Sequence, residues 1–339
     1  MDGERMTNGP RRVALIATGG TIDSVGVDRL DLAWYIEADK RLGPGELLAQ
    51  LPELAEIAQI EEIPFRRLKS HGLVVKDWLD LARLIHEVFS GDRAEGLVIT
   101  HGTNTLEETA YFLNLVLKTD RPVVLVGSMR PASGLSADGP LNLLNAVRVA
   151  ADPTSRGRGV LVVMNDTIHG GRDVTKTATY RLQTFEGGDM GPLGYSDADG
   201  RVVFYHRTAR RHTHETEFDV RGMESLPRVD VVVSYVGADG TLIDAAVAAG
   251  AAGIVSAGTG AGRPTPLEDE ALTRAHERGV VVCQSSRVGS GRVVRAPALV
   301  RRGFVAADNL VPWKARALLS LALTRTKDPA KIQSMFDEY

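Results

Sequence analysis

The stretch VALIATGGT, residues 13–21, places an apolar run directly before two glycines and a threonine. Val13–Ala17 lacks the alternation of a half-buried strand, so it predicts a strand that is covered on both faces of a parallel sheet. Gly19–Gly20 predicts a tight turn after that strand, because glycine accepts backbone angles that other residues avoid. The same arrangement of an apolar run followed by small and polar residues recurs along the chain.

Six further apolar runs predict strands at Gly96–Thr100, Pro122–Val126, Gly159–Met164, Val229–Tyr235, Gly253–Ala257 and Val280–Gln284. Helical patterns lie between them, at Lys76–Phe89, Leu106–Lys118, Pro140–Ala151, Leu242–Ala249, Leu267–Arg278 and Val311–Arg325. Strand–helix alternation at this spacing predicts an α/β protein with right-handed crossovers.

A chain of 339 residues favours two domains over one. Residues 194–228 are polar and lack a helical repeat, although Tyr195–Tyr205 predicts a hairpin that turns at Asp199–Gly200. We therefore expect a larger N-terminal domain, residues 1–207, with a mostly parallel sheet and flanking helices. A linker at residues 208–228 and a smaller α/β domain at residues 229–339 follow it.

Composition narrows the classes of partner. The net charge is −3 without long blocks of one sign, which predicts neither nucleic acid nor membrane as a partner. No apolar run approaches the roughly 20 residues that span a bilayer. Residues 1–12 lack the apolar segment of a secretory signal, so we expect a cytoplasmic protein. The single cysteine, Cys283, lies in VVVCQSS and is interpreted as a buried strand residue rather than a nucleophile.

Polar turns follow the predicted strands, where open parallel sheets bind their ligands. These turns are Thr18–Thr21, His101–Thr105, Gly127–Pro131 and Asn165–Thr167, with Lys176 a little further on. The first turn lacks the Lys-Ser/Thr ending of a P-loop. It also lacks the Gly-x-Gly-x-x-Gly fingerprint of a dinucleotide-binding fold, which argues against a dinucleotide-dependent oxidoreductase. Taken alone it is a structural turn. The second predicts a helix N-cap at Thr103, Asn104 or Thr105, with Glu107–Glu108 complementing the helix dipole.

The combination of these turns indicates nucleophilic chemistry. A hydroxyl attacks poorly until a base removes its proton. A desolvated lysine can be neutral near pH 7 and fill that role through a second hydroxyl, which suits two threonine turns and Lys176. Glycine-rich turns also expose N–H groups that can hold an oxyanion. The alternative for Lys176 is an ordinary surface lysine.

Longer motifs in the same order make the chain similar to the bacterial L-asparaginase family. They are ATGGTI at 17–22, ITHGTNTLEETAYFL at 99–113, PVVLVGSMRP at 122–131, SADGPLNLLNAV at 136–147 and GVLVVMNDT…GRDVTKT at 159–177. The similarity continues through YVGADG, GIVSAGTGAG, SSRV and ALTRTKDPAKIQ. The resemblance implies a two-domain α/β fold, a homotetramer of intimate dimers, and neither a metal nor an organic cofactor.

The resemblance also implies a catalytic set. It marks Thr21 as the nucleophile and Tyr35 as the tyrosine that hydrogen-bonds it. Thr103 corresponds to the second threonine, and Lys176 to the lysine that activates it. The implied reaction is attack of Thr21 on an amide carbon, release of ammonia, and hydrolysis of the acyl-enzyme by water.

The implied substrate-binding residues include the departures from the family. Ser70 corresponds to the serine that holds the substrate α-carboxylate, and Ser128 lies in the turn whose carbonyl meets the carboxamide. Asn104 replaces the family aspartate that pairs with the α-ammonium, and His71 replaces a glutamine. Arg263 or Ala261 stands where the neighbouring subunit lends an asparagine. The loop Gly289–Pro297, which matches the segment that lends an acid, carries arginines and no acid.

Three functional interpretations remain open at this point. The first is hydrolysis of L-asparagine, with the departures tolerated. The second is a related amide without a free α-amino group, such as a dicarboxylic acid monoamide, or an N-substituted asparagine, because arginine suits carboxylates. An exposed Arg263 together with an acid from another loop entering the site would contradict that interpretation. The third is a non-catalytic binding protein on the same fold, against which Thr21, Thr103 and Lys176 are all present.

Overall fold

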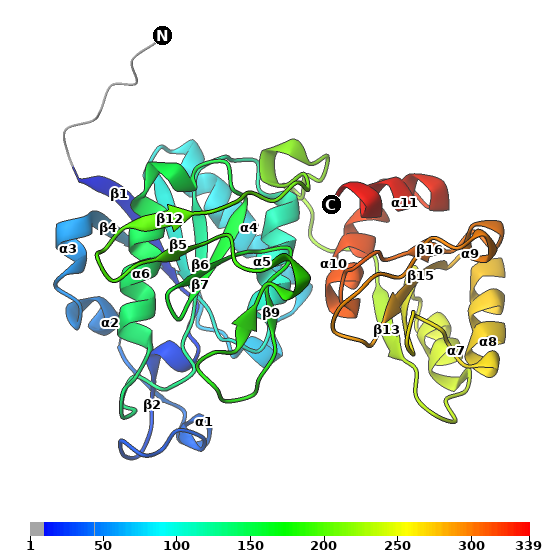
Figure 1. Cartoon of the computed structure of the whole chain (residues 1–339), viewed down its shortest axis with the longest axis horizontal. Helices are drawn as coiled ribbons and strands as arrows, with labels where there is room; N and C mark the ends of the chain where they lie inside the picture. The colour runs from blue at the N-terminus through cyan, green and yellow to red at the C-terminus, as the bar shows by residue number, and fades with distance from the viewer. Residues whose placement is uncertain (1–9, 44) are drawn as a thin grey trace, which may run out of the picture.

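The computed structural model describes residues 10–43 and 45–339 and contains two α/β domains joined by residues 205–228 (Figure 1). The larger domain holds an eight-stranded sheet and the smaller a four-stranded sheet. The predicted fold class is therefore confirmed. The expectation about a secretory signal rests on residues 1–12, of which the first nine lie outside the described residues.

The large sheet has the strand order β12-β11-β8-β7-β6-β5-β1-β4. Its strands are β1 (Arg11–Ala17), β4 (Ala58–Ile63), β5 (Gly96–Thr100), β6 (Val123–Val126), β7 (Val160–Met164), β8 (Thr167–Gly170), β11 (Gly194–Ser196) and β12 (Val202–Phe204). The five strands from β4 to β7 pair in parallel, and the three beyond β7 pair antiparallel. The carboxyl ends of β1, β5, β6 and β7 therefore share one edge of the sheet.

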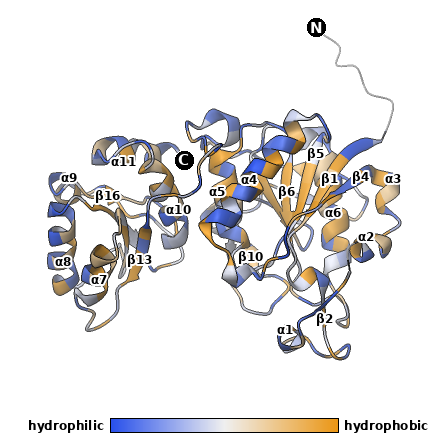
Figure 2. Cartoon of the chain, turned by 180° about the vertical axis from the view of Figure 1, so that it is seen from behind, coloured by the Kyte–Doolittle hydropathy of each residue, from blue (hydrophilic) through white to orange (hydrophobic). Residues whose placement is uncertain are grey.

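Side chains of the central strands alternate between two apolar cores. Ala14 and Ile16 pack with helices α4 (Val75–Ser90) and α5 (Leu106–Val116) on one face. Val13 and Leu15 pack with α3 (Leu54–Ile57) and α6 (Gly139–Ala151) on the other, to which α2 (Glu46–Ala49) adds apolar side chains. Figure 2 shows the hydrophobic strands between amphipathic helices. This double cover explains why the runs lack alternation.

The small domain is a parallel sheet of β13 (Val229–Val233), β14 (Gly253–Gly258), β15 (Val281–Ser286) and β16 (Val305–Ala306). Its helices are α7 (Thr241–Ala248), α8 (Pro266–Glu277), α9 (Pro297–Arg301), α10 (Pro312–Ala322) and α11 (Pro329–Glu338). Side chains of α7 and α8 pack in one core of this domain. Those of α10 and α11 belong to the core that also contains α4 and α5, so one apolar core runs through both domains.

The segment that we predicted as a polar linker contacts both domains. Thr216 donates a hydrogen bond to the carbonyl oxygen of Leu115 at the end of α5. Arg211 forms an ion pair with Glu338 on α11. The segment is therefore a packed connection, in which Thr216 and Arg211 bind partners that are distant in sequence.

All seven predicted strands and six predicted helices are present, with ends that move by up to three residues. The run Val229–Tyr235, for example, stops pairing at Val233. The predicted hairpin is formed by β11 and β12. The structure adds β4, an edge strand whose AQIEEI sequence carries two exposed acids and gave no apolar run. No described helix combines the length and the apolar character needed to cross a membrane.

Shorter elements surround the edge where the parallel strands end. They are β2 (Ser24–Val25), α1 (Tyr35–Ala38), β3 (Lys40–Arg41), β9 (Thr175–Lys176) and β10 (Phe185–Glu186). Strand β2 pairs with β3, and β9 pairs with β10, both antiparallel. These small hairpins place residues from the segments after β1 and after β8 beside the same edge of the sheet (Figure 1).

Candidate active site

Thr21 begins a short 3₁₀ helix immediately after β1. The turn before it needs positive φ angles at Gly19 and Gly20, 94° and 119°, which glycine adopts without a steric penalty. The Thr21 hydroxyl lies 2.9 Å from the phenol oxygen of Tyr35, which begins α1. The strand and the turn thus present one hydroxyl beside one phenol at the edge of the sheet.

Two glycine turns and one serine approach each other closely at this edge. A Cβ atom on Gly20 would lie 2.6 Å from the Cα atom of Gly102. A Cβ atom on Gly102 would lie 2.5 Å from the Ser70 hydroxyl oxygen. Real Cβ atoms do not approach other atoms so closely, so both positions require glycine. The contact places the turn after β1, the turn after β5 and the Ser70 segment side by side.

Lys176 and Thr103 form a second pair of polar groups. The Lys176 ammonium donates to the Thr103 hydroxyl at 2.8 Å. Lys176 is half-buried on β9, and burial lowers the pKa of its ammonium, while the charge of Glu107 opposes that shift. A lowered pKa makes a neutral lysine accessible, which is what a general base requires.

Tyr35 is a protonated hydrogen-bond partner of Thr21 rather than a phenolate base. The Tyr35 side chain is buried, and burial raises the pKa of its phenol above its usual value near 10. The phenol therefore keeps its proton near neutral pH. Of the two groups, Lys176 is the one whose environment favours loss of a proton.

His101 has a structural role. Its side chain is fully buried, and burial lowers its pKa to about 4, so the imidazole is neutral near pH 7. One ring nitrogen lies 2.8 Å from the Gly102 carbonyl oxygen, and the other lies 3.0 Å from the Thr109 hydroxyl. Thr109 in turn accepts from Trp78. These contacts fix the turn that carries Thr103.

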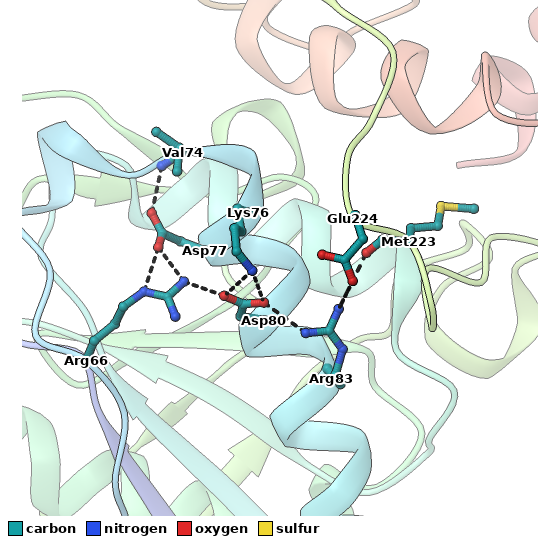
Figure 3. Close-up of polar contacts among 8 residues, drawn as sticks. All are labelled: Arg66, Val74, Lys76, Asp77, Asp80, Arg83, Met223 and Glu224. Atoms are coloured by element: carbon teal, nitrogen blue, oxygen red, sulfur yellow. Dashed lines mark hydrogen bonds and ion pairs between the residues drawn. The ribbon is translucent and has the colours of Figure 1, made fainter.

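An ion-pair clamp holds the segment that carries Ser70 and His71 (Figure 3). Arg66, just before this segment, donates to Asp77 on α4 at 2.8 Å and to Asp80 at 2.7 Å. Asp77 also accepts from the Val74 amide at 2.8 Å, just after the segment. Both ends of the segment are therefore fixed to the first turns of α4.

The same network continues to the connection between the domains. Asp80 also accepts from Arg83 at 2.9 Å, and Arg83 lies 3.7 Å from Glu224 and donates to the Met223 carbonyl (Figure 3). The α4 helix thus links the Ser70 segment to the chain that enters the small domain.

A cavity of about 500 Å³ opens at this edge of the sheet. The predicted site residues that line it are Thr21, Tyr35, Ser70, His71, Thr103, Asn104 and Lys176. They come from five separate segments of the large domain. The structure thus brings the Thr21–Tyr35 pair, the Thr103–Lys176 pair and the predicted binding groups together around one cavity.

Two predicted site residues do not line this cavity. Ser128 is buried and donates to the Arg130 carbonyl at 2.7 Å, and its neighbour Met129 is the lining residue. Arg263 is exposed in the small domain, at a turn where it pairs with Thr259 through the backbone. Within one chain, therefore, neither side chain contributes to the cavity.

The predicted helix cap is wrong in one respect. Thr105 is the N-cap residue of α5, but its side chain does not accept a bond from the helix. The Thr105 hydroxyl instead donates to the Ser70 carbonyl at 2.7 Å. The Thr105 side chain therefore makes a long-range hydrogen bond instead of capping the helix, and this bond fixes Ser70 against the turn after β5.

Other lining residues were not predicted from the sequence. Asp39, Lys40, Arg41 and Lys69 add charges to the cavity wall. The Asp39 carboxylate lies 3.3 Å from Lys69 and 3.9 Å from Arg41.

Glu107, interpreted from the sequence as an acid that complements the helix dipole, is buried and accepts a hydrogen bond from the Lys176 amide at 3.4 Å. The positions of Glu107 and of the charged lining residues depend on contacts between distant segments, and no local pattern marks them.

Two family models match most of the chain. A family model described as "Asparaginase, N-terminal" matches residues 12–210, and one described as "Glutaminase/Asparaginase C-terminal domain" matches residues 228–336. L-asparaginase 2 of Escherichia coli (strain K12) is 44% identical over 329 residues, covering 96% of this chain and 93% of the relative. L-asparaginase 2 of Bacillus subtilis (strain 168) is 42% identical over 327 residues, covering 96% and 86%.

Two further similarities extend this picture. Glutaminase-asparaginase of Pseudomonas fluorescens biotype A is 42% identical over 330 residues, covering 96% of this chain and 90% of the relative. The crystal structure of a probable cytoplasmic L-asparaginase from Campylobacter jejuni superimposes with a TM-score of 0.92 at 39% identity. That superposition covers 97% of this chain and all of the solved chain.

The close approach of the turns predicts that Gly102→Ala destabilises the fold. The added methyl group would overlap the Ser70 side chain, so we expect the free energy of unfolding to fall by about 1–3 kcal/mol. Denaturant unfolding measures the change. Gly72→Ala is the matched control, because a Cβ there meets nothing within 4 Å. Equal stability of the two variants would contradict the packing argument.

The clamp predicts that Asp77→Asn loosens the Ser70 segment. The loss of the carboxylate charge weakens the hydrogen bonds that Asp77 accepts from Arg66 and Val74. Because a charge-assisted hydrogen bond contributes about 1.5 kcal/mol, we expect amide hydrogen exchange in residues 67–74 to accelerate roughly tenfold. Lys76→Ala, which removes an exposed partner of Asp80 on the same helix, should leave this exchange unchanged. Equal exchange in both variants would show that the clamp does not hold the segment.

Proposed function

The chain belongs to the asparaginase family of amidohydrolases, and from this premise we propose that it releases ammonia from the side chain of L-asparagine through an acyl-enzyme on Thr21. The observation that carries the proposal is the pairing of Thr21 with Tyr35 and of Thr103 with Lys176 around one cavity. A nucleophile needs a hydroxyl that can be activated and space for a substrate, and the cavity offers both.

The proposed reaction has two stages. The Thr21 oxygen forms a bond to the amide carbon, the carbon–nitrogen bond breaks, and the hydroxyl proton ends on the departing ammonia. Water then attacks the ester, which releases L-aspartate and restores the Thr21 hydroxyl. Neutral Lys176, acting through Thr103, is the group that takes and returns a proton, because burial favours its uncharged form.

Substrate recognition is proposed for three other residues that line the cavity. We propose that Ser70 meets the α-carboxylate, and its contacts with Thr105 and Gly102, which hold it at the cavity, support this role. Asn104 brings an uncharged amide to the cavity where the family has an acid. Asp39, which also lines the cavity, is the carboxylate that we assign to the α-ammonium.

The alternative of an amino-free amide has lost its main support. It required an arginine near the substrate and no acid there. Arg263, the arginine on which that interpretation relied, is exposed and does not line the cavity of its own chain. Arg41 does line the cavity, but its guanidinium is already paired with Asp23 at 3.1 Å, and the acid Asp39 also lines it. The non-catalytic alternative does not account for Thr21, Thr103 and Lys176 around one cavity. Relatives named glutaminase-asparaginase make L-glutamine the second substrate to examine.

We also propose that the chain forms a homotetramer of intimate dimers in the cytoplasm. The similarity to a probable cytoplasmic L-asparaginase supports the compartment, although a relative in Haemophilus influenzae is named as periplasmic. The assembly follows from the resemblance to the family. Partners in this proposal are small amide substrates and further copies of the chain.

Ammonia release from a matched panel tests the proposed activity. The panel contains L-asparagine, L-glutamine, D-asparagine, succinamate and malonamate. We expect L-asparagine to be the fastest substrate. We expect Thr21→Ala to lose at least about 10³-fold in kcat, because the nucleophile is removed. Thr21→Ser keeps a hydroxyl and is the control that should retain part of the activity. Faster turnover of succinamate than of L-asparagine would overturn the assigned substrate.

A further inference from the structure

We propose that Lys314, on helix α10 of the small domain, is a positioning residue of the active site that acts on Lys176 through the buried carboxylate of Glu107. This inference rests on the proposed function. It assigns the small domain a part in the site of its own chain, although none of its residues lines the cavity.

Lys314 holds the turn that leads to Lys176. Its side chain is 1% exposed, and its ammonium donates to the carbonyl oxygens of Arg172, at 2.6 Å, and of Val174. A longer contact, 3.5 Å, reaches the Gly171 carbonyl. Buried ammonium groups need such acceptors, because burial without partners is costly. Val174 is two residues before Lys176, so the small domain fixes the start of β9.

Arg172 strengthens the same attachment. Its guanidinium donates to the terminal carbonyl of Tyr339 at 2.8 Å and to the Asn309 side chain at 2.8 Å, both in the small domain. It also pairs with Asp173 at 2.9 Å. The turn 171–174 is therefore bound from two sides by groups of the small domain, and Lys176 continues directly from it.

Glu107 is the carboxylate whose charge acts on both lysines. It is 5% exposed, and one of its oxygens accepts from the Lys176 amide at 3.4 Å. Its other oxygen is buried without a hydrogen-bond partner among the described residues. The charge of Glu107 raises the pKa of Lys176 and is the largest charge effect that opposes burial at Lys314, whose pKa burial lowers to about 8.

The remaining charges near these groups lie on the Lys314 side. Asp173, Arg172 and Glu108 act on Lys314, and Arg316 acts on Glu108. At Lys176, Glu107 is the charge that acts on the ammonium, and the Thr103 hydroxyl is its hydrogen-bond partner. A change of charge at Glu107 is therefore expected to reach Lys176 directly, and a change of charge at Lys314 to reach it through Glu107.

The charge balance explains why this arrangement suits a base. A buried Glu107 alone would hold the proton on Lys176, because an isolated buried carboxylate needs a cation. With Lys314 protonated, a second cation acts on Glu107, so an opposite charge still acts on the buried carboxylate when Lys176 loses its proton. Lys314 thus permits the neutral form of Lys176 that the proposed reaction uses.

Two variants should move the pH profile in opposite directions. In Lys314→Met, Lys176 is the remaining lysine on which the charge of Glu107 acts, and this stabilises the protonated form of Lys176. The acidic limb of the pH profile of kcat should therefore shift up by roughly one pH unit. Glu107→Gln keeps an oxygen for the Lys176 amide but removes the negative charge, so the acidic limb should shift down by a similar amount. Lys314→Arg keeps the charge and should leave the limb at the wild-type position.

The measurement is kcat for ammonia release from saturating L-asparagine across pH 5–9 (a range chosen to span both limbs), with Lys331→Met on the exposed surface of α11 as the control. Opposite shifts support the inference. Limbs that stay at the wild-type pH, or that move together, overturn it. Should Lys314→Met fail to fold, the uncharged but polar Lys314→Gln replaces it: an upward shift supports the inference and an unmoved limb overturns it. A wild-type protein without any amide hydrolysis would instead refute the proposed function.

Discussion

The close approach of Gly20 and Gly102 is the constraint on which the site depends. Both residues lack a side chain at a point where a Cβ atom would collide with the neighbouring segment. Parallel pairing of β1 with β5 brings the two turns to the same edge of the sheet, and the absence of side chains lets them touch. Thr21 and Thr103 each follow one of these glycines directly, so the contact sets where both hydroxyls lie.

Burial then gives the neighbouring groups different roles. The buried His101 is neutral and structural, the buried Tyr35 keeps its phenol proton, and the half-buried Lys176 is moved toward its neutral form. The same physical effect, the cost of placing a charge away from water, thus acts on all three groups. It keeps His101 neutral as a structural residue, keeps the proton on Tyr35, and favours the uncharged form of Lys176. The charged network around Glu107 and Lys314 modifies this effect at the base and connects it to the second domain.

The sequence predicted what depends on local pattern. Strands such as Val160–Met164 are apolar on both faces, and the turns after them are marked by glycine and threonine, so fold class and the position of the cavity followed. The edge strand Ala58–Ile63 was not predicted because the adjacent exposed acids Glu61 and Glu62 interrupt its apolar residues. The bond from Thr105 to Ser70, the burial of Glu107 and the placement of Asp39 at the cavity all depend on segments distant in sequence. The hydrophobic periodicity of a sequence carries no information about such long-range contacts.

The central claim is that Thr21 becomes covalently acylated during turnover. Rapid acid quenching of the enzyme during hydrolysis of L-asparagine, followed by digestion and mass spectrometry, tests this claim directly. The account predicts a transient aspartyl group on the peptide that contains Thr21, absent from Thr21→Ala. An acyl group on another residue, or full turnover by Thr21→Ala, would contradict it.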